Sequence, residues 1–197
     1  MFFFRSFLAL LCILLCDLRS EAINNHDLFT QMNFIEGWYV IYTKSRYEKK
    51  IAQNLIEQNF KVYLPLNTTI SQWSDRKKNV EKPLFSSYVF VYLKTIKDYL
   101  KALTIDGVVL FIKFGGRLVR VLDEEINSIK IFLNQFSQVE LKNSLDIQVG
   151  ERKRITSGPF ENYECEIIKI DNKQKICVRI NSLQQSLIAE IHSYHLI

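Results

Sequence analysis

The sequence predicts an α+β protein, made of an α/β sandwich of the split βαβ type followed by a small β-barrel. Strand-like and helix-like segments over residues 36–136 come in the order β-α-β-β-α-β-α, and short strand-like segments fill residues 147–197. The polar stretch 137–146 between them predicts a linker. A chain of 197 residues, 48% of them hydrophobic and 24% charged, has ordinary globular composition and room for one domain or two small ones.

The sandwich opens with a strand and a helix. Residues 38–44, WYVIYTK, are rich in aromatic and β-branched side chains, which favours a strand. Ser45 and Glu48 have the spacing of a capping box, so a helix is expected to begin there. Residues 60–73 predict a second strand, and residues 74–83 the tip and return of a long hairpin.

The strand that follows the hairpin carries an unusual number of aromatic residues. In residues 88–93, YVFVYL, alternation places Tyr88, Phe90 and Tyr92 on one face and aliphatic side chains on the other. A central strand buried on both faces explains this pattern. A partner-binding aromatic stripe, typical of the centres of interfaces, explains it equally well.

The remaining elements follow from caps and turns. Thr95 and Asp98 have capping-box spacing before a helical apolar pattern, and Asp123 is expected to cap a further helix. Gly115 and Gly116 predict a turn between two strand segments, since neither phosphate-loop spacing follows them. Short strands separated by turn residues after position 147 are typical of a small barrel.

Charge and composition restrict the function. Residues 32–142 carry 17 basic and 11 acidic side chains, whereas residues 143–197 carry 7 of each. An excess of basic residues favours a polyanion or an acidic protein surface as partner, and a merely solvated face is the alternative. The four cysteines show no zinc-ligand spacing, and no nucleophile elbow, phosphate loop or acid-base pair appears, so neither a cofactor nor enzymatic activity is expected.

The N-terminus leaves two interpretations open. Residues 1–22 resemble a secretory signal, with a short apolar run followed by small residues at Ser20 and Ala22. Alternatively, translation begins at Met32 and residues 1–31 are an upstream extension. The first interpretation predicts an exported protein, and the second a cytoplasmic one.

Four stretches together resemble the NusG family of transcription elongation factors. They are GWYVIYTKSRYEKK, EKPLFSSYVFVYL, FIKFGG followed by DEEI, and VGERKRITSGPF. The resemblance covers residues 36–197 and is closest to the specialised RfaH-like and UpxY-like antiterminators, which share the PLF..Y.FV strand and the basic hairpin before it. It implies a ferredoxin-like N-terminal domain followed by an SH3-like barrel of the KOW type.

The resemblance also implies a role and its residues. Such factors bind the clamp helices of RNA polymerase in the cytoplasm, suppress pausing and termination, and are not enzymes. The positions that match the clamp-binding residues are Tyr42, Phe85, Tyr88 and Phe90. Lys44 matches a position that contacts non-template DNA. The residues expected to extend this contact are Arg46, Lys49, Lys50 and the hairpin residues Arg76, Lys77 and Lys78.

Finer expectations rest on analogy with the family. The target is expected to be a surface-polysaccharide operon, and the barrel is expected to bind a ribosomal protein or a termination factor; no membrane partner is expected. Asn162 and Cys165 stand where the family's barrel motif has glycine, which questions the usual partner surface. An RNA- or ribosome-binding protein is the main alternative, although a ribosomal barrel is expected to be strongly basic.

Overall fold

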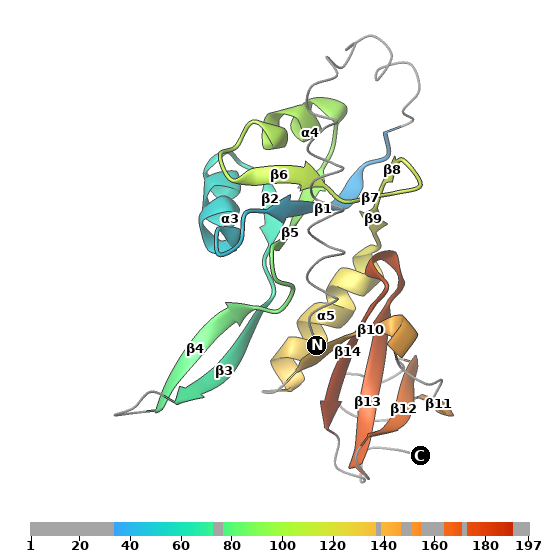
Figure 1. Cartoon of the computed structure of the whole chain (residues 1–197). Coiled ribbons are helices and arrows are strands. Elements are labelled where there is room, and N and C mark those ends of the chain that lie inside the picture. The colour runs from blue at the N-terminus through green and yellow to red at the C-terminus, as the bar shows by residue number, and fades with distance from the viewer. Residues whose placement is uncertain are drawn as a thin grey trace. The chain divides into compact units, whose positions relative to one another are not determined.

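The computed structural model describes residues 34–72, 77–136, 139–146, 151–154, 164–170 and 173–190 (Figure 1). Residues 35–197 form one compact unit. The N-terminal domain contains β1 (Gly37–Thr43), α3 (Glu48–Glu57), β2 (Lys61–Tyr63), β3 (Leu66–Gln72), β4 (Lys77–Pro83), β5 (Tyr88–Leu93), α4 (Ile96–Leu103), β6 (Val108–Phe111), β7 (Lys113–Phe114), β8 (Arg117–Leu118), β9 (Arg120–Val121) and α5 (Asp123–Gln135). The C-terminal domain contains β10 (Glu140–Asn143), η2 (Ser144–Asp146), β11 (Glu151–Arg154), β12 (Glu164–Ile170), β13 (Lys173–Ile180), η3 (Asn181–Leu183) and β14 (Gln185–Glu190). The predicted α+β class is confirmed, with a β-rich domain after the sandwich.

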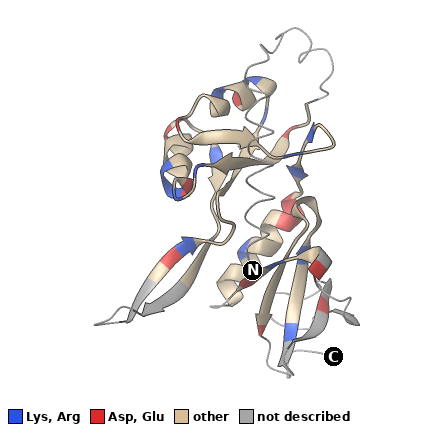
Figure 2. Cartoon of the chain, viewed as in Figure 1, with Lys and Arg blue, Asp and Glu red and all other residues tan. Residues whose placement is uncertain are grey.

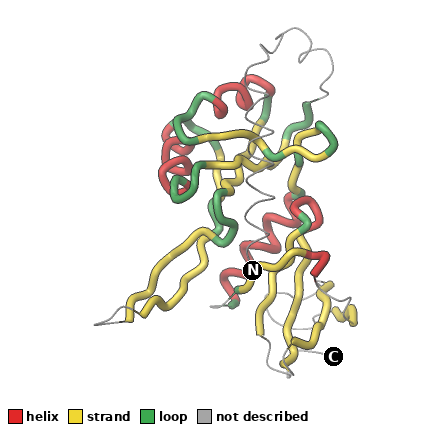
Figure 3. Tube along the Cα trace, in the orientation of Figure 1, coloured by secondary structure: helices red, strands yellow, loops and turns green. Residues whose placement is uncertain are grey.

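The N-terminal domain is built on an antiparallel sheet with the order β2-β5-β1-β6, in which β9 also pairs with β1 (Figure 3). The register of β1 and β5 places Tyr42 opposite Tyr88 and Val40 opposite Phe90. Directly paired residues share a face of the sheet. Trp38, Tyr42 and the aromatic residues of β5 therefore line one face, whereas Tyr39, opposite Val91, lies on the other.

Both faces of the sheet are covered. The helices α3 and α4 contact β5 on the aliphatic face, where Val89 and Val91 are fully buried. On the aromatic face, Phe90 belongs to a buried cluster that also contains residues of α5 and of the C-terminal domain. The indole Nε1 of Trp38 donates to Asp123 Oδ1 at 3.0 Å and so joins β1 to the start of α5. Strand β5 is thus a central strand buried on both sides, with Tyr88 half-buried.

The second predicted strand is interrupted. Strand β2 ends at Tyr63, and β3 begins at Leu66 and pairs with β4 as a separate two-stranded ribbon. Pro65 lies in the break, because proline has no N–H to donate to a ladder; its carbonyl accepts from the N–H of Leu84 at 2.8 Å. The tip of this hairpin, residues 73–76, lies outside the described residues.

Of the predicted helix caps, one is confirmed and two are wrong. Asp123 does not cap α5, because the N-cap is Leu122 and Asp123 is the first residue of the helix. The N–H of Asp98 donates to Thr95 Oγ1 at 3.3 Å, and the N–H of Thr95 donates to Asp98 Oδ2 at 2.9 Å, which completes the capping box of α4. Helix α3 instead begins after Tyr47, and no side chain caps it. Glu48 does not reach back to Ser45, because its Oε1 accepts from the N–H of Ser87 at 2.7 Å.

The C-terminal domain is an antiparallel sheet with the order β10-β14-β13-β12-β11. Strand β10 lies inside the segment that the sequence predicts to be a linker, and it pairs with β14 from Glu140 opposite Ile188 onward. Apolar residues alternate with charged ones from Val139 to Lys142, and this alternation is typical of a half-buried strand. Part of the predicted linker therefore belongs to the C-terminal sheet.

A buried ion pair joins two strands of the C-terminal sheet. Arg179 on β13 donates from Nε and Nη2 to the two carboxylate oxygens of Glu166 on β12, at 2.9 and 2.8 Å, and from Nη1 to the Ser144 carbonyl at 3.0 Å. The hydrogen bond to Glu166 raises the pKa of Arg179. The Glu166 side chain is only 10% exposed, so its charge depends on this partner.

We expect Arg179→Gln to lower the free energy of unfolding by about 3 kcal/mol, because it removes a cation that makes two hydrogen bonds to a buried carboxylate. Urea unfolding of the full chain followed by circular dichroism measures this loss. Lys49→Gln is the control, since Lys49 and Glu81 lie 3.8 Å apart and are more than half exposed; it should cost less than about 1 kcal/mol. Equal losses in the two variants would contradict the structural role of the buried pair.

Tyr63 gives a pH-dependent prediction. Burial raises the pKa of Tyr63 to about 12, whereas an unfolded tyrosine ionises near 10.0. Between these values the folded chain holds a proton that the unfolded chain has lost. Protonated Tyr63 therefore contributes its full share to the free energy of unfolding below pH 10, and this share is lost as the pH rises toward 12. Between pH 10 and pH 12, the free energy of unfolding of Tyr63→Phe should fall by about 1 to 2 kcal/mol less than that of the wild type. Urea titrations at each pH measure this difference. Identical pH profiles would contradict a raised pKa.

Candidate interaction site

The four residues that match clamp-binding positions form one aromatic cluster. The rings of Tyr42 and Tyr88 meet edge to face, with centroids 5.9 Å apart, and those of Phe85 and Phe90 do so at 5.5 Å. Tyr42 and Tyr88 are half-buried, whereas Phe85 and Phe90 are 2% and 0% exposed. Burial, with a smaller contribution from Tyr42, raises the pKa of Tyr88. In this structure, solvent reaches the two tyrosines, and the two phenylalanines pack beneath the surface.

A buried carboxylate fixes the turn that precedes β5. Ser87 has a φ of 64°, its N–H donates to Glu48 Oε1, and its carbonyl accepts from the N–H of Thr43 at 2.8 Å. Glu48 is 6% exposed. The start of α3, the end of β1 and the turn before Tyr88 are therefore held together, and the position of the tyrosine pair depends on this contact.

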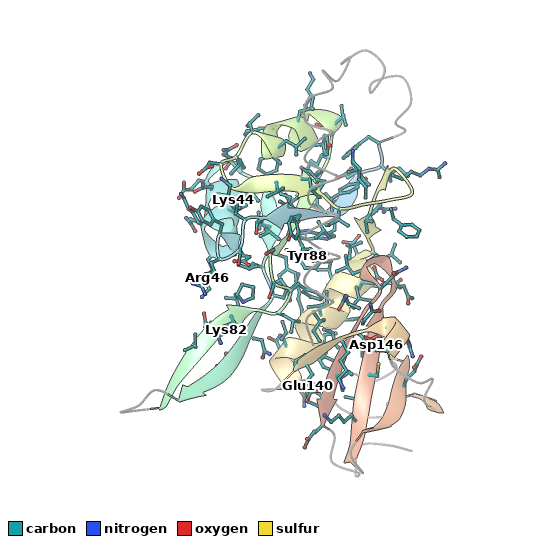
Figure 4. The ribbon with its side chains drawn as sticks, viewed as in Figure 1. Lys44, Arg46, Lys82, Tyr88, Glu140 and Asp146 are labelled. Atoms are coloured by element: carbon teal, nitrogen blue, oxygen red, sulfur yellow. The ribbon has the colours of Figure 1, made fainter. Side chains whose placement is uncertain are left out.

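The predicted basic residues Lys44, Arg46, Lys49 and Lys50 surround the N-terminal end of α3, where all four are exposed. Figure 4 shows Lys44 and Arg46 beside this end of the helix, and Figure 2 shows its mixture of basic and acidic positions. Lys44 Nζ lies 3.6 Å from Asp106 Oδ1. Among the described residues, neither Arg46 nor Lys50 has a carboxylate within ion-pair distance.

The basic hairpin is described only in part. Arg76 lies outside the described residues, and only the backbone of Lys77 and Lys78 is described, at the start of β4. Their predicted nucleic-acid contact stays a prediction. The ion pair between Lys49 and Glu81 nevertheless brings β4 beside α3. Lys82, exposed on β4 and labelled in Figure 4, adds a positive charge on this strand.

The structure adds three residues that the sequence pattern did not single out. Besides Lys82, these are Tyr47, whose ring has two lysine ammonium groups near it, and Phe114, which is 75% exposed in the β7–β8 hairpin. In the sequence, Tyr47 has the same spacing as the apolar residues on the buried face of α3. Only its 37% exposure in the structure shows that it is accessible to solvent. Phe114 lies directly before the Gly115-Gly116 turn, and an apolar residue next to a predicted turn could have indicated an exposed aromatic side chain.

The β7–β8 hairpin and Tyr88 border a common cavity. Tyr88, Phe114 and the η3 residue Ser182 line a cavity of about 440 Å³. The η3 segment is attached to the N-terminal domain, because the N–H of Ser182 donates to Glu125 Oε1 on α5 at 3.1 Å. The C-terminal domain thus lies next to the Tyr88 ring.

Within the described part of the chain, no helix is both long and apolar enough to cross a membrane. No three His, Cys, Asp or Glu side chains in that part are grouped as metal ligands.

The chain was then compared with known proteins. Residues 36–130 match the family model described as transcription termination factor nusG. The transcription termination/antitermination proteins NusG of Staphylococcus carnosus and Staphylococcus aureus are 27% and 29% identical to it, over 78% of this chain and 91% of theirs. A solved structure of Thermotoga maritima NusG is 27% identical and covers 82% of this chain and 96% of its own, with a TM-score of 0.48.

The family match spans the whole sandwich from the strand β1 into α5, including the aromatic cluster and the basic end of α3. The curated relatives extend the similarity into the C-terminal domain. The chain is therefore similar to NusG transcription termination/antitermination proteins through its N-terminal domain and into its C-terminal domain.

Proposed function

We propose that this protein is an antiterminator that binds the clamp helices of RNA polymerase and suppresses pausing and termination. The binding surface is built on Tyr42, Phe85, Tyr88 and Phe90. The two tyrosines supply the accessible contact, and the two phenylalanines supply the packing beneath it.

The observation that carries this proposal is the fixed, half-buried pair of Tyr42 and Tyr88. Aromatic side chains bury a large area with few rotatable bonds, so a preformed pair loses little entropy when it meets a helical partner. The bond between Glu48 and the N–H of Ser87 supports the preformed geometry. The similarity to termination/antitermination proteins supports the polymerase as the partner.

The basic end of α3 would contact the exposed non-template DNA strand. Lys44, Arg46, Lys49 and Lys50 provide phosphate-binding groups at one end of the helix, and the hairpin residues Arg76, Lys77 and Lys78 extend the contact. Such contacts release counterions and weaken as salt rises. The role therefore divides into an aromatic contact to protein and a basic contact to nucleic acid.

The specialised part of the role rests on the stretch EKPLFSSYVFVYL, which resembles the strand of the RfaH-like and UpxY-like antiterminators. By this analogy the target is a surface-polysaccharide operon, and the factor acts in the cytoplasm. The C-terminal domain would bind a ribosomal protein or a termination factor. An operon-wide transcript profile of a deletion strain tests this part separately.

Tyr88→Ala should weaken binding of the chain to RNA polymerase from its own cells at least tenfold, because truncation of a central interface aromatic typically costs about 2 kcal/mol or more. Surface-immobilised polymerase and purified full chain give the affinity. Leu100→Ala is the matched control, since Leu100 is 39% exposed on α4, which covers the opposite face of the sheet. A folded Tyr88→Ala variant with wild-type affinity would contradict the clamp assignment.

The salt dependence of binding to a reconstituted elongation complex tests the DNA contact. Each of Lys44→Ala, Arg46→Ala and Lys50→Ala should reduce the slope of log K against log salt concentration by about 0.7, the value expected for one single-strand phosphate contact. Filter binding at four salt concentrations measures this slope. Lys101→Ala, exposed on α4, should leave the slope unchanged. Unchanged slopes in all the α3 variants would contradict the DNA contact.

A further inference from the structure

We infer that the ring of Tyr47 is a stacking platform for a base of single-stranded nucleic acid. The inference rests on the proposed function, because it assumes that the N-terminal end of α3 faces nucleic acid. It adds a contact to a base, whereas the contacts proposed above are to phosphates. Tyr47 has no assigned role in either the aromatic or the basic group.

The Tyr47 ring is held in place by its neighbours. The N–H of Tyr47 donates to the Lys44 carbonyl at 3.1 Å, and its own carbonyl accepts from the N–H of Ile51 at 2.8 Å. Gly107, at a φ of 93°, lies against the ring, because a Cβ at this position would be 3.0 Å from Tyr47 Cδ1. The backbone and this close approach fix the ring, which remains 37% exposed.

Two ammonium groups lie over the ring within cation–π distance. Lys50 Nζ is 5.3 Å and Lys44 Nζ is 6.0 Å from the ring centroid. Lys50 comes from the first turn of α3, and Lys44 from the chain that leads into it. A base stacked on the ring would place its flanking phosphates within reach of these two cations, as in proteins that bind single strands with aromatic platforms in basic grooves.

The local charge favours nucleic acid over an apolar partner. Three further basic side chains are exposed nearby: Arg46 in the turn before α3, Lys49 on α3 and Lys82 on β4. Figure 4 shows Arg46 and Lys82 on one side of the domain. Lys44 lies 3.6 Å from Asp106 and Lys49 lies 3.8 Å from Glu81, and all four side chains are more than half exposed. An exposed pair of this kind is weak and can exchange for a phosphate.

The test uses the full chain and two fluorescent oligomers with equal charge, a 12-mer of thymidylate and a 12-mer of abasic tetrahydrofuran phosphate. Anisotropy titrations at low salt give both affinities for each variant. We expect the wild type and Tyr47→Phe to prefer the thymidylate oligomer roughly tenfold, as one stacked base provides. Tyr47→Ala should lose this preference while the slope of its salt dependence is unchanged.

Ile56→Ala, which removes an exposed side chain from the same helix, is the control and should keep the preference. A preference that survives in Tyr47→Ala, or a wild type that binds both oligomers equally, would overturn the stacking role and leave the phosphate contacts standing. No binding of either oligomer would overturn both the stacking role and the proposed DNA contact. Tyr47-dependent binding of a poly-glutamate peptide with the same affinity would assign the ring to an acidic protein surface instead.

Discussion

The hydrogen bond from the N–H of Ser87 to the buried carboxylate of Glu48 is the contact on which the arrangement of the site depends. It joins the first turn of α3 to the turn that enters β5, and the carbonyl of Ser87 in turn accepts from Thr43 at the end of β1. Tyr42 and Tyr88 directly neighbour Thr43 and Ser87 in the chain, and the basic turn directly precedes α3. A single carboxylate therefore sets the position of both proposed contacts relative to one sheet.

The order of elements could be read from the sequence, because each depends on local patterns. The helix α4 begins at its predicted capping box, and β5 has the alternation that the letters YVFVYL predict. The errors arose where tertiary contacts override local signals. Glu48 has the spacing of a cap, but a backbone N–H 39 positions away competes for its carboxylate. Strand β10 was hidden in a polar stretch, because its partner β14 is distant in the chain.

The residue types of the site could be predicted from the sequence, whereas the solvent exposure of its side chains could be predicted only in part. The register of β1 and β5 brings Tyr42 and Tyr88 together, as the alternation requires. Burial of Phe85 and Phe90 could not be read from the strand alone, because the buried cluster around them includes residues of α5 and of the C-terminal domain. Tyr47 was hidden for a similar reason, since its place beside Gly107 brings together segments sixty positions apart.

The measurement that tests the central claim most directly is affinity purification of the tagged native protein from its own cells, with mass spectrometry of the co-purifying subunits and of the N-terminal peptide. The account predicts that RNA polymerase subunits are recovered in stoichiometric amounts. A protein that recovers no polymerase and carries a cleaved N-terminus at Ile23 would contradict it and would indicate an exported protein that shares only the fold.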